Sequence, residues 1–158
     1  MNGRFGKFVA AALLVAGVVA GSAQAQERMV EGDMAAEAMK YRVNVMRAIG
    51  AHMGAVGAIL QGKVENKDDI AAHGASLAGL SAMLDDLFPK GSEAGSKLKP
   101  EFFADGDKPM AMIKALQDAS QKVAAAAAAG DMAGVGQNMG AMGAQCGACH
   151  KAYRLPQS

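Results

Sequence analysis

The sequence predicts an all-α protein, folded as an up-down-up-down four-helix bundle, on three observations. The 158-residue chain contains 51% hydrophobic residues but only 4% aromatic ones and no Trp, a composition that favours helices over sheets. Apolar residues recur at steps of three and four over long stretches, as on the buried face of a helix. Gly, Pro, Asp and Asn separate these stretches, and the connections are short enough for neighbouring antiparallel helices.

The first 25 residues have the pattern of a secretory signal peptide. A short basic start precedes an apolar run over residues 8–21, and Ala23 and Ala25 supply the small residues of a cleavage site. A membrane anchor is the alternative, but the run is shorter than the roughly 20 apolar residues that a span needs. We therefore expect cleavage after Ala25 and export, which in a Gram-negative cell means the periplasm. Residues 26–158 form the mature domain.

The charge of the mature domain limits its partners. The whole chain carries a net charge of +1, and the leader contains two bases and no acid, so the mature domain has a net charge of −1. A near-neutral domain is not expected to bind nucleic acid. We also expect no stable membrane insertion, because no later segment is expected to span a bilayer.

The first helix is expected over residues 33–61, with Gly62 at its end. A second helix follows Asn66, which is expected to cap it, and ends at Phe88 and Pro89. The inner seam of the first helix is Met39, Val43, Met46, Gly50, Met53, Gly57 and Leu60; that of the second is Ile70, Leu77, Leu80, Leu84 and Leu87.

Residues 90–106 lack apolar periodicity and are rich in Gly, Ser, Lys and Pro, so we expect a long exposed loop there. Asp107 is expected to cap the third helix, which ends in an alanine run before Gly130. Asp131 then caps the fourth helix, whose apolar residues step by three and four as far as Tyr153.

Glycines inside the first and fourth predicted helices are unexpected, because each costs about 1 kcal/mol relative to alanine. Either they let two helices approach closely, or they leave room for a large flat ligand between these two helices. We favour the second explanation. The glycines are Gly50, Gly54, Gly57, Gly134, Gly136, Gly140, Gly143 and Gly147.

The chemistry of the chain is concentrated in the segment Cys146-Gly-Ala-Cys149-His150, which uses both cysteines. The pattern C-x-x-C-H indicates c-type haem attachment. Because positions three apart lie on one side of a helix, both sulfurs can form thioethers at one porphyrin edge. His150 follows directly and can bind the iron. We therefore predict one covalent haem c near the C-terminal helix, with His150 as the proximal ligand.

Three other uses of the thiols compete with this prediction. A zinc site needs about four ligands, and the further candidates, His52 and His73, are distant in sequence. We expect His52 to be a partly buried structural residue and His73 to lie on the surface. A redox dithiol belongs at a helix start within a βαβ pattern, whereas no strand is predicted here. A structural disulfide would leave His150 and the export signal without a role.

A ligand for the other haem face must come from upstream, because the motif lies near the C-terminus. The first helix is expected to cover that face, with Met46 in the middle of its inner seam. Met39 and Met53 share the seam and are alternatives. Packing is the usual role of a single core methionine in a chain with 12 of them.

A C-terminal C-x-x-C-H motif followed by Tyr153 and Arg154, on the last helix of an exported four-helix bundle, resembles class II cytochromes c. This family includes cytochromes c′ and cytochrome c-556. Residues 41–59, with Met46, and residues 87–89 are similar to the family's first helix and to the end of its second. The resemblance covers the whole mature chain.

The resemblance implies two alternatives at the distal haem face. In the c-556 type a methionine of the first helix binds iron, which makes a low-spin electron carrier, and the matching residue is Met46. In cytochromes c′ that position is open to nitric oxide or carbon monoxide. The sequence around Met46 is closer to the c-556 type. It therefore predicts an electron-transfer protein, not an enzyme, that serves redox proteins of the periplasm or inner membrane.

The resemblance also bears on Arg42 and on assembly. Arg42 lies one turn before Met46, where the family suggests a contact with a haem propionate; the alternative is a solvated helix charge. The family further suggests an antiparallel homodimer through the first two helices. Lys151 and Arg154 are expected to interact favourably with the partial negative charge at the C-terminal end of the last helix. Tyr153 is expected to pack at the end of the apolar seam of that helix.

Overall fold

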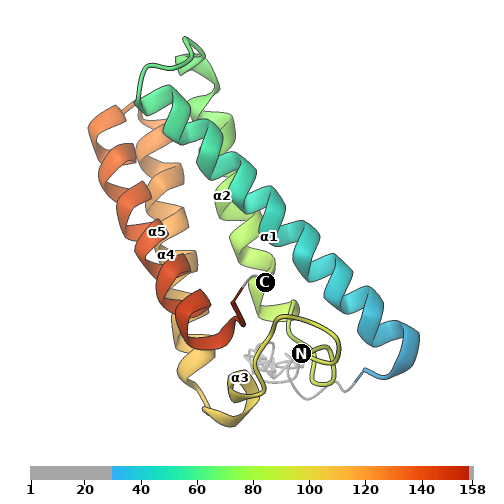
Figure 1. The fold of residues 1–158 in the computed structure, drawn as a ribbon. Coiled ribbons are helices and arrows are strands. Elements are labelled where there is room, and N and C mark those ends of the chain that lie inside the picture. Colours follow the sequence, from blue (N-terminus) through green and yellow to red (C-terminus); the bar gives the residue numbers. More distant parts are fainter. Residues whose placement is uncertain (1–29, 157–158) are drawn as a thin grey trace, which may run out of the picture.

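The computed structural model describes residues 30–156, which fold as a helical bundle (Figure 1). The predicted signal peptide, residues 1–25, lies outside these residues. Residues 30–156 contain no strand, and an isolated antiparallel bridge joins Leu98 to Arg154. The elements are α1 (Gly32–Leu60), η1 (Lys67–Asp69), α2 (Ile70–Ala82), η2 (Met83–Asp86), α3 (Glu101–Ala104), α4 (Lys108–Ala128) and α5 (Met132–Tyr153).

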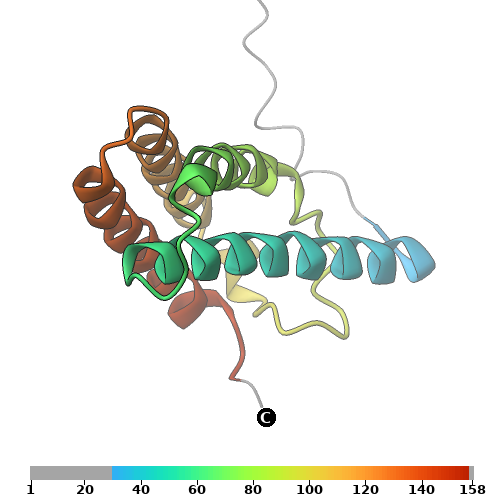
Figure 2. The same cartoon turned by 90° about the horizontal axis from the view of Figure 1, so that it is seen from above.

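The four long helices α1, α2, α4 and α5 form the predicted up-down-up-down bundle. α4 packs along both α2 and α5, and α1 packs mainly on α2. α1 approaches α5 at the end of the bundle near η1 and diverges from it toward the end near α3 (Figure 1). Viewed from above, the first half of α1 extends beyond the other helices (Figure 2). The first and last helices are therefore splayed apart at the end that carries the C-terminus of α5.

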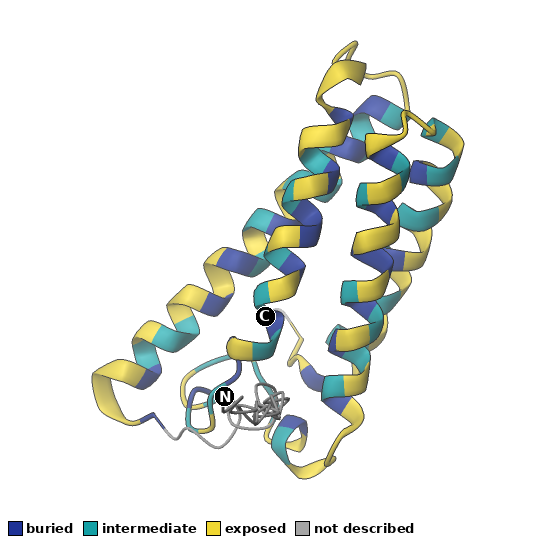
Figure 3. Ribbon diagram, turned by 180° about the vertical axis from the view of Figure 1, so that it is seen from behind, coloured by how far each residue is buried: buried dark blue, intermediate teal, exposed yellow. Residues whose placement is uncertain are grey.

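The core lies between the inner faces of the four long helices, and exposed residues cover their outer faces (Figure 3). Val56, Leu77, Val123 and Met142 are fully buried there, one from each long helix. Full burial of such a side chain contributes about 1.5–3 kcal/mol to folding. On α5 this core includes Val135 and Met142 of the first half and Tyr153 at the C-terminal end.

α2 and α4 come closest together at Gly74. A Cβ atom added at Gly74 would lie 2.7 Å from the Ala127 Cβ and 3.2 Å from the Ala124 Cα. Small side chains therefore allow this helix pair to pack closely. The alanine run of α4 supplies those small side chains.

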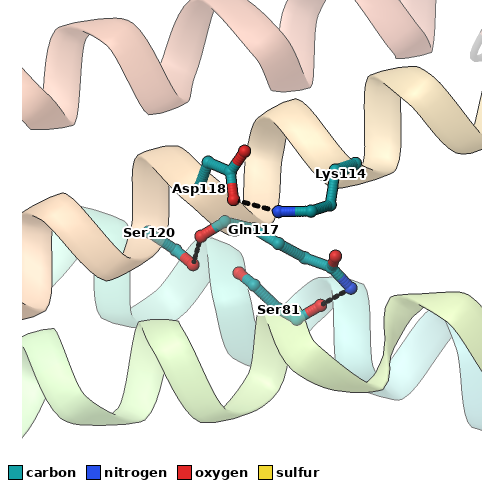
Figure 4. Close-up of polar contacts among 5 residues, drawn as sticks. All are labelled: Ser81, Lys114, Gln117, Asp118 and Ser120. Atoms are coloured by element: carbon teal, nitrogen blue, oxygen red, sulfur yellow. Dashed lines mark hydrogen bonds and ion pairs between the residues drawn. The ribbon is translucent and has the colours of Figure 1, made fainter. Parts of the chain in front are cut away.

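Polar groups also link α2 to α4 (Figure 4). The Gln117 side-chain amide donates to the Ser81 carbonyl at 3.3 Å, and the Ser120 hydroxyl donates to the Gln117 carbonyl at 2.7 Å. Lys114 and Asp118 form an exposed ion pair one turn apart along α4, which contributes little to stability in water. The Gln117–Ser81 bond crosses between the two helices, whereas the buried Ser81 hydroxyl itself has no hydrogen-bond partner among the described residues.

Several helix ends follow the predictions. Gly62 and Gly130 lie just beyond α1 and α4 with φ values of +64° and +67°, a conformation that glycine adopts without strain. The Asp131 carboxylate accepts a hydrogen bond from the Gly134 backbone N–H at 2.9 Å, so Asp131 caps α5 as expected.

Two predicted caps differ from expectation. Asn66 makes no side-chain bond to the backbone of the following turn; its amide instead donates to the Asp69 carboxylate at 3.2 Å. Asp107 likewise makes no side-chain cap bond to α4. Both residues have backbone angles outside the extended region that a capping residue typically adopts.

The expectation of an exposed loop over residues 90–106 is wrong in part. The segment contains α3, and both Ser92 and Phe102 are buried. The Phe102 ring stacks on Phe88 with centroids 4.4 Å apart. Gly91 has φ +97°, and a Cβ there would lie 2.2 Å from the Val30 carbonyl oxygen. Two adjacent phenylalanines have no periodicity that reveals burial in advance.

Judged by length and composition, the expectation that no segment after the leader could span a bilayer is also wrong. α1 is long and apolar enough to cross a membrane, with a mean hydropathy of 1.3 over its most apolar window. In the bundle, its buried residues Val45, Ile49, Val56 and Ile59 join the core. A core helix of a soluble bundle meets the same two criteria of length and composition.

Candidate haem site

The residues of the C-x-x-C-H motif lie in the last two turns of α5, opposite α1. Cys146 and Cys149 are free, half-buried thiols, three residues apart on one side of the helix. His150 is half-buried beside them. The structure therefore brings the three predicted haem-binding residues together on the face of α5 that looks toward the splayed half of α1.

Two adjoining cavities fill the space between α1 and this end of α5. The smaller has a volume of about 130 Å³ and is lined mainly by apolar side chains, including Ile49 and Met53 of α1 and Met112 of α4. The larger has a volume of about 480 Å³. The residues that line both cavities are Met46, Phe88, Cys149 and His150. Because the cavities share these residues, they form one cleft with α1 and α5 as opposite walls.

The position of Met46 in this cleft differs from those of Met39 and Met53, the two alternative distal ligands. Met39 lines only the larger cavity and Met53 only the smaller, whereas Met46 lines both, as His150 does. Met112 of α4 is a fourth methionine in the cleft. Met112 was not among the predicted ligands, because α4 is not the helix expected to face the motif.

Burial shifts the acid–base behaviour of the motif. It raises the pKa of the Cys146 thiol, and burial together with the neighbouring Cys146 raises the pKa of the Cys149 thiol. Burial, followed by the charge of Arg154, lowers the pKa of His150. At neutral pH the site therefore holds protonated thiols and a neutral imidazole, the form of histidine that binds a metal.

The mouth of the larger cavity is positively charged. Arg42, Arg47, Lys97 and Arg154 line it, and no Asp or Glu is among the described residues of its wall. Such a wall suits a ligand that carries carboxylates, because charge-assisted hydrogen bonds to arginine are the stronger ones. No pattern in the sequence predicts that Arg47 and Lys97 join Arg42 and Arg154 in this wall.

Arg42 is not the solvated helix charge that was one of its two expected roles. It is only 6% exposed, and its guanidinium donates to the Leu87 carbonyl at 3.2 Å, the Ser92 hydroxyl at 2.7 Å and the Ser92 carbonyl at 2.9 Å. Burial lowers its pKa, against the opposing effect of Glu93. Arg42 thus fastens residues 87–92 to α1, and its contact with a propionate stays a prediction.

The C-terminal end of α5 is held by the segment before α4. Tyr153 is buried as expected, and its hydroxyl donates to the Asp105 carboxylate at 3.0 Å. Phe102 packs edge-on against the Tyr153 ring with centroids 5.5 Å apart. The Lys99 ammonium donates to the Ala152 carbonyl at 3.0 Å, where the partial negative charge of the helix end favours a cation. These contacts fix the helix turn that carries His150.

The two remaining histidines lie outside the cleft. His52 is half-buried, as expected, but the expectation that His73 lies on the surface is wrong, since it is half-buried against His52. Neither residue lines the cleft. The structure therefore does not bring them to the cysteines as zinc ligands.

Among the glycines of α1 and α5, Gly50 fits the prediction of room for a ligand, because it lines the smaller cavity. Cβ atoms added at Gly54, Gly140 or Gly147 would also meet no atom within 4 Å, but these glycines are exposed and line neither cavity. At Gly143 the only close atom is the Met53 Cε at 3.9 Å. Two thiols, an imidazole, an apolar cleft and a cationic mouth together suit a covalently held haem.

The sequence profile of the family described as Cytochrome C′ matches residues 37–154. The chain belongs to the cytochrome c′ family. A cytochrome c-556 of Agrobacterium tumefaciens (strain II Chrys) is 36% identical over 115 residues, covering 72% of this chain and 93% of that protein. A cytochrome c′ of Pararhodospirillum photometricum is 31% identical over 118 residues, covering 73% and 94%. Both names occur at similar identity, so the choice between the two types depends on the residue opposite His150.

Solved structures of cytochrome c′ share the fold. The ferric cytochrome c prime from Alcaligenes xylosoxidans is 32% identical, with a TM-score of 0.73 over 78% of this chain and 97% of that chain. A nitric oxide complex of a variant of the same protein has a TM-score of 0.74 at 32% identity, covering 80% and 100%. Proteins of this family bind covalent haem c, so haem c is the cofactor of this chain and the predicted bundle is its fold.

Proposed function

We propose that this member of the cytochrome c′ family is an exported electron carrier of the c-556 type. Cys146 and Cys149 hold the haem through thioether bonds, His150 is the proximal iron ligand and Met46 of α1 is the distal ligand. The observation that carries the proposal is that Met46 lines both halves of the cleft from the wall opposite His150.

When bound, the haem supplies a one-electron redox centre whose potential rises with a thioether ligand opposite an imidazole. His150 offers a neutral ring at neutral pH, because burial lowers its pKa. The smaller cavity offers the haem a mainly apolar surface. Arg47 and Arg154 offer guanidinium groups to the carboxylates of the cofactor at the cleft mouth. With both axial positions filled, no place is left for a substrate, so we propose that the protein is not an enzyme.

Optical spectra of the purified haem-loaded protein test the role of Met46. We expect low-spin spectra in both oxidation states, with a thioether-to-iron band in the ferric form. Met46→Leu keeps an apolar side chain of similar size and should give a high-spin ferric spectrum. Met39→Leu and Met53→Leu are matched controls on the same helix face and should leave the spectrum low-spin. A high-spin wild type, or a spectrum that follows one of the controls, contradicts the assignment.

A second candidate is a five-coordinate cytochrome c′ that binds nitric oxide or carbon monoxide. It is favoured by the relatives that are themselves cytochromes c′. In that case the ferrous wild type should bind carbon monoxide as fast as Met46→Ala does. In the electron-carrier case, binding should be slow until Met46 is removed.

We further propose that the protein is exported to the periplasm after cleavage behind Ala25 and exchanges electrons with redox proteins there or in the inner membrane. The mass of the purified protein tests the first point: it should equal residues 26–158 plus one haem. A mass without haem, from a host able to attach it, would contradict the assignment of the two cysteines. We expect neither nucleic acid binding nor stable membrane insertion.

A further inference from the structure

A second pair of metal-binding side chains lies apart from the haem cleft. His52 of α1 and His73 of α2 face each other, with their Nδ1 atoms 2.9 Å apart. The ring centroids are 5.1 Å apart and the ring planes meet at 66°. Both residues are half-buried, and neither lines the cleft. Two imidazole nitrogens from different helices therefore converge on one point that water can reach.

The separation of the two nitrogens suits two ligands of one metal ion. Metal–nitrogen distances of 2.0–2.1 Å place two imidazole nitrogens at right angles roughly 2.9 Å apart, and in a tetrahedral arrangement roughly 3.4 Å apart. Imidazole is a common ligand of zinc, nickel and copper. In the metal-free pair, one ring donates its Nδ1–H to the Nδ1 atom of the other. An ion would replace this hydrogen bond once both rings carry their hydrogen on Nε2.

We propose that His52 and His73 form a binding site for a divalent transition-metal ion that bridges α1 and α2. No third His, Cys, Asp or Glu within residues 30–156 joins them in a cluster, so water molecules complete the coordination of the ion. A bound ion would tie α1 to α2 beside Met53, which lines the haem cleft. The site therefore stiffens the helix that carries Met46.

The composition of the chain makes the proposal simple to test. The chain has three histidines and two cysteines, and in the haem-loaded protein His150 and both cysteines are engaged by the cofactor. The assignment of His150 and both cysteines to the haem rests on the proposed function. His52 and His73 are then the two imidazoles left to bind an added ion. Failure of haem attachment would show in the spectrum, whereas failure of the metal site would not.

The experiment titrates Ni²⁺ and Zn²⁺ into the haem-loaded, tag-free mature protein by calorimetry. We expect one ion per chain, and His52→Asn or His73→Asn should each weaken binding at least about tenfold, because even the loss of a supporting residue around a metal costs that much. Ser76→Ala is the matched control: its hydroxyl donates to the Ala72 carbonyl of its own helix, and it should bind like the wild type.

A second measurement does not depend on variants that fold. Zn²⁺ should shift the ring resonances of both histidines in the nuclear magnetic resonance spectrum of the wild type, and should raise its melting temperature. Absence of stoichiometric binding, unchanged ring resonances, or binding that survives both substitutions would overturn the proposal. The pair would then be a hydrogen bond between helices and nothing more.

Discussion

Replacement of Arg42 by methionine tests whether a buried cation holds the floor of the haem cleft to α1. The side chain is 6% exposed, and its guanidinium carbon lies 5.4 Å from the centroid of the Phe88 ring. Its three hydrogen bonds all go to Leu87 and Ser92. Methionine keeps the apolar stem in place and removes every donor.

The expected loss of unfolding free energy follows from the hydrogen-bond acceptors that lose their partner. The substitution strands the Leu87 carbonyl, the Ser92 carbonyl and the Ser92 hydroxyl, all in buried residues. A buried polar group left without a partner costs about 1–3 kcal/mol. Burial of the charged guanidinium is itself unfavourable, as its lowered pKa indicates. Its removal therefore offsets part of the cost of the unpaired acceptors. We expect a net loss of about 3 kcal/mol, which lowers Tm on the order of 10 °C.

Guanidinium chloride unfolding of the haem-loaded protein, followed by circular dichroism, measures this loss. Lys40→Met is the matched control, because Lys40 is an exposed cation of the same helix that lines neither cavity. The control should change the unfolding free energy by less than about 0.5 kcal/mol. If Arg42→Met costs no more than Lys40→Met, then Arg42 does not fasten residues 87–92, and its burial has another reason.

Four further substitutions test other parts of the bundle. Gly74→Ala should destabilise the protein by about 1 kcal/mol on unfolding, since the clash with α4 outweighs the gain in helix propensity, whereas Gly79→Ala, with open space around it, should stabilise it. Asp131→Ala should cost about 1 kcal/mol through the lost cap of α5. Burial and then the hydrogen bond to Asp105 raise the pKa of Tyr153; the protonated phenol therefore stabilises the fold below its ordinary value of about 10, and this stabilisation is lost as pH rises through the higher folded value. A tyrosinate titration of Tyr41→Phe, which leaves Tyr153 alone, should show a midpoint above 10; a midpoint at or below 10 would contradict the buried contact.

The local pattern of the chain was sufficient for the bundle and for the motif. Steps of three and four, together with Asp131, Gly62 and Gly130, predicted the four long helices to within a few residues. These signals lie within one or two turns of each other, so they can be recognised in the sequence alone. The spacing of Cys146 and Cys149 likewise decides by itself that both sulfurs share one helix face.

Contacts between distant segments could not be predicted in this way. The burial of Arg42 against Ser92, the stacking of Phe102 on Phe88 and the pairing of His52 with His73 join residues from 14 to 50 positions apart. No periodicity links such residues, because their distance depends on how helices and loops cross rather than on the rise of one helix. The same reason kept Met112 out of the predicted site.

The sequence alone thus predicted the groups that can bind a haem: two thiols and an imidazole at one helix end, and methionines on the seam of another helix. Which methionine stands opposite the imidazole depends on the splay between α1 and α5, a property of the packed bundle. Covalent attachment needs only neighbours in sequence, whereas an axial ligand from another helix needs the tertiary fold.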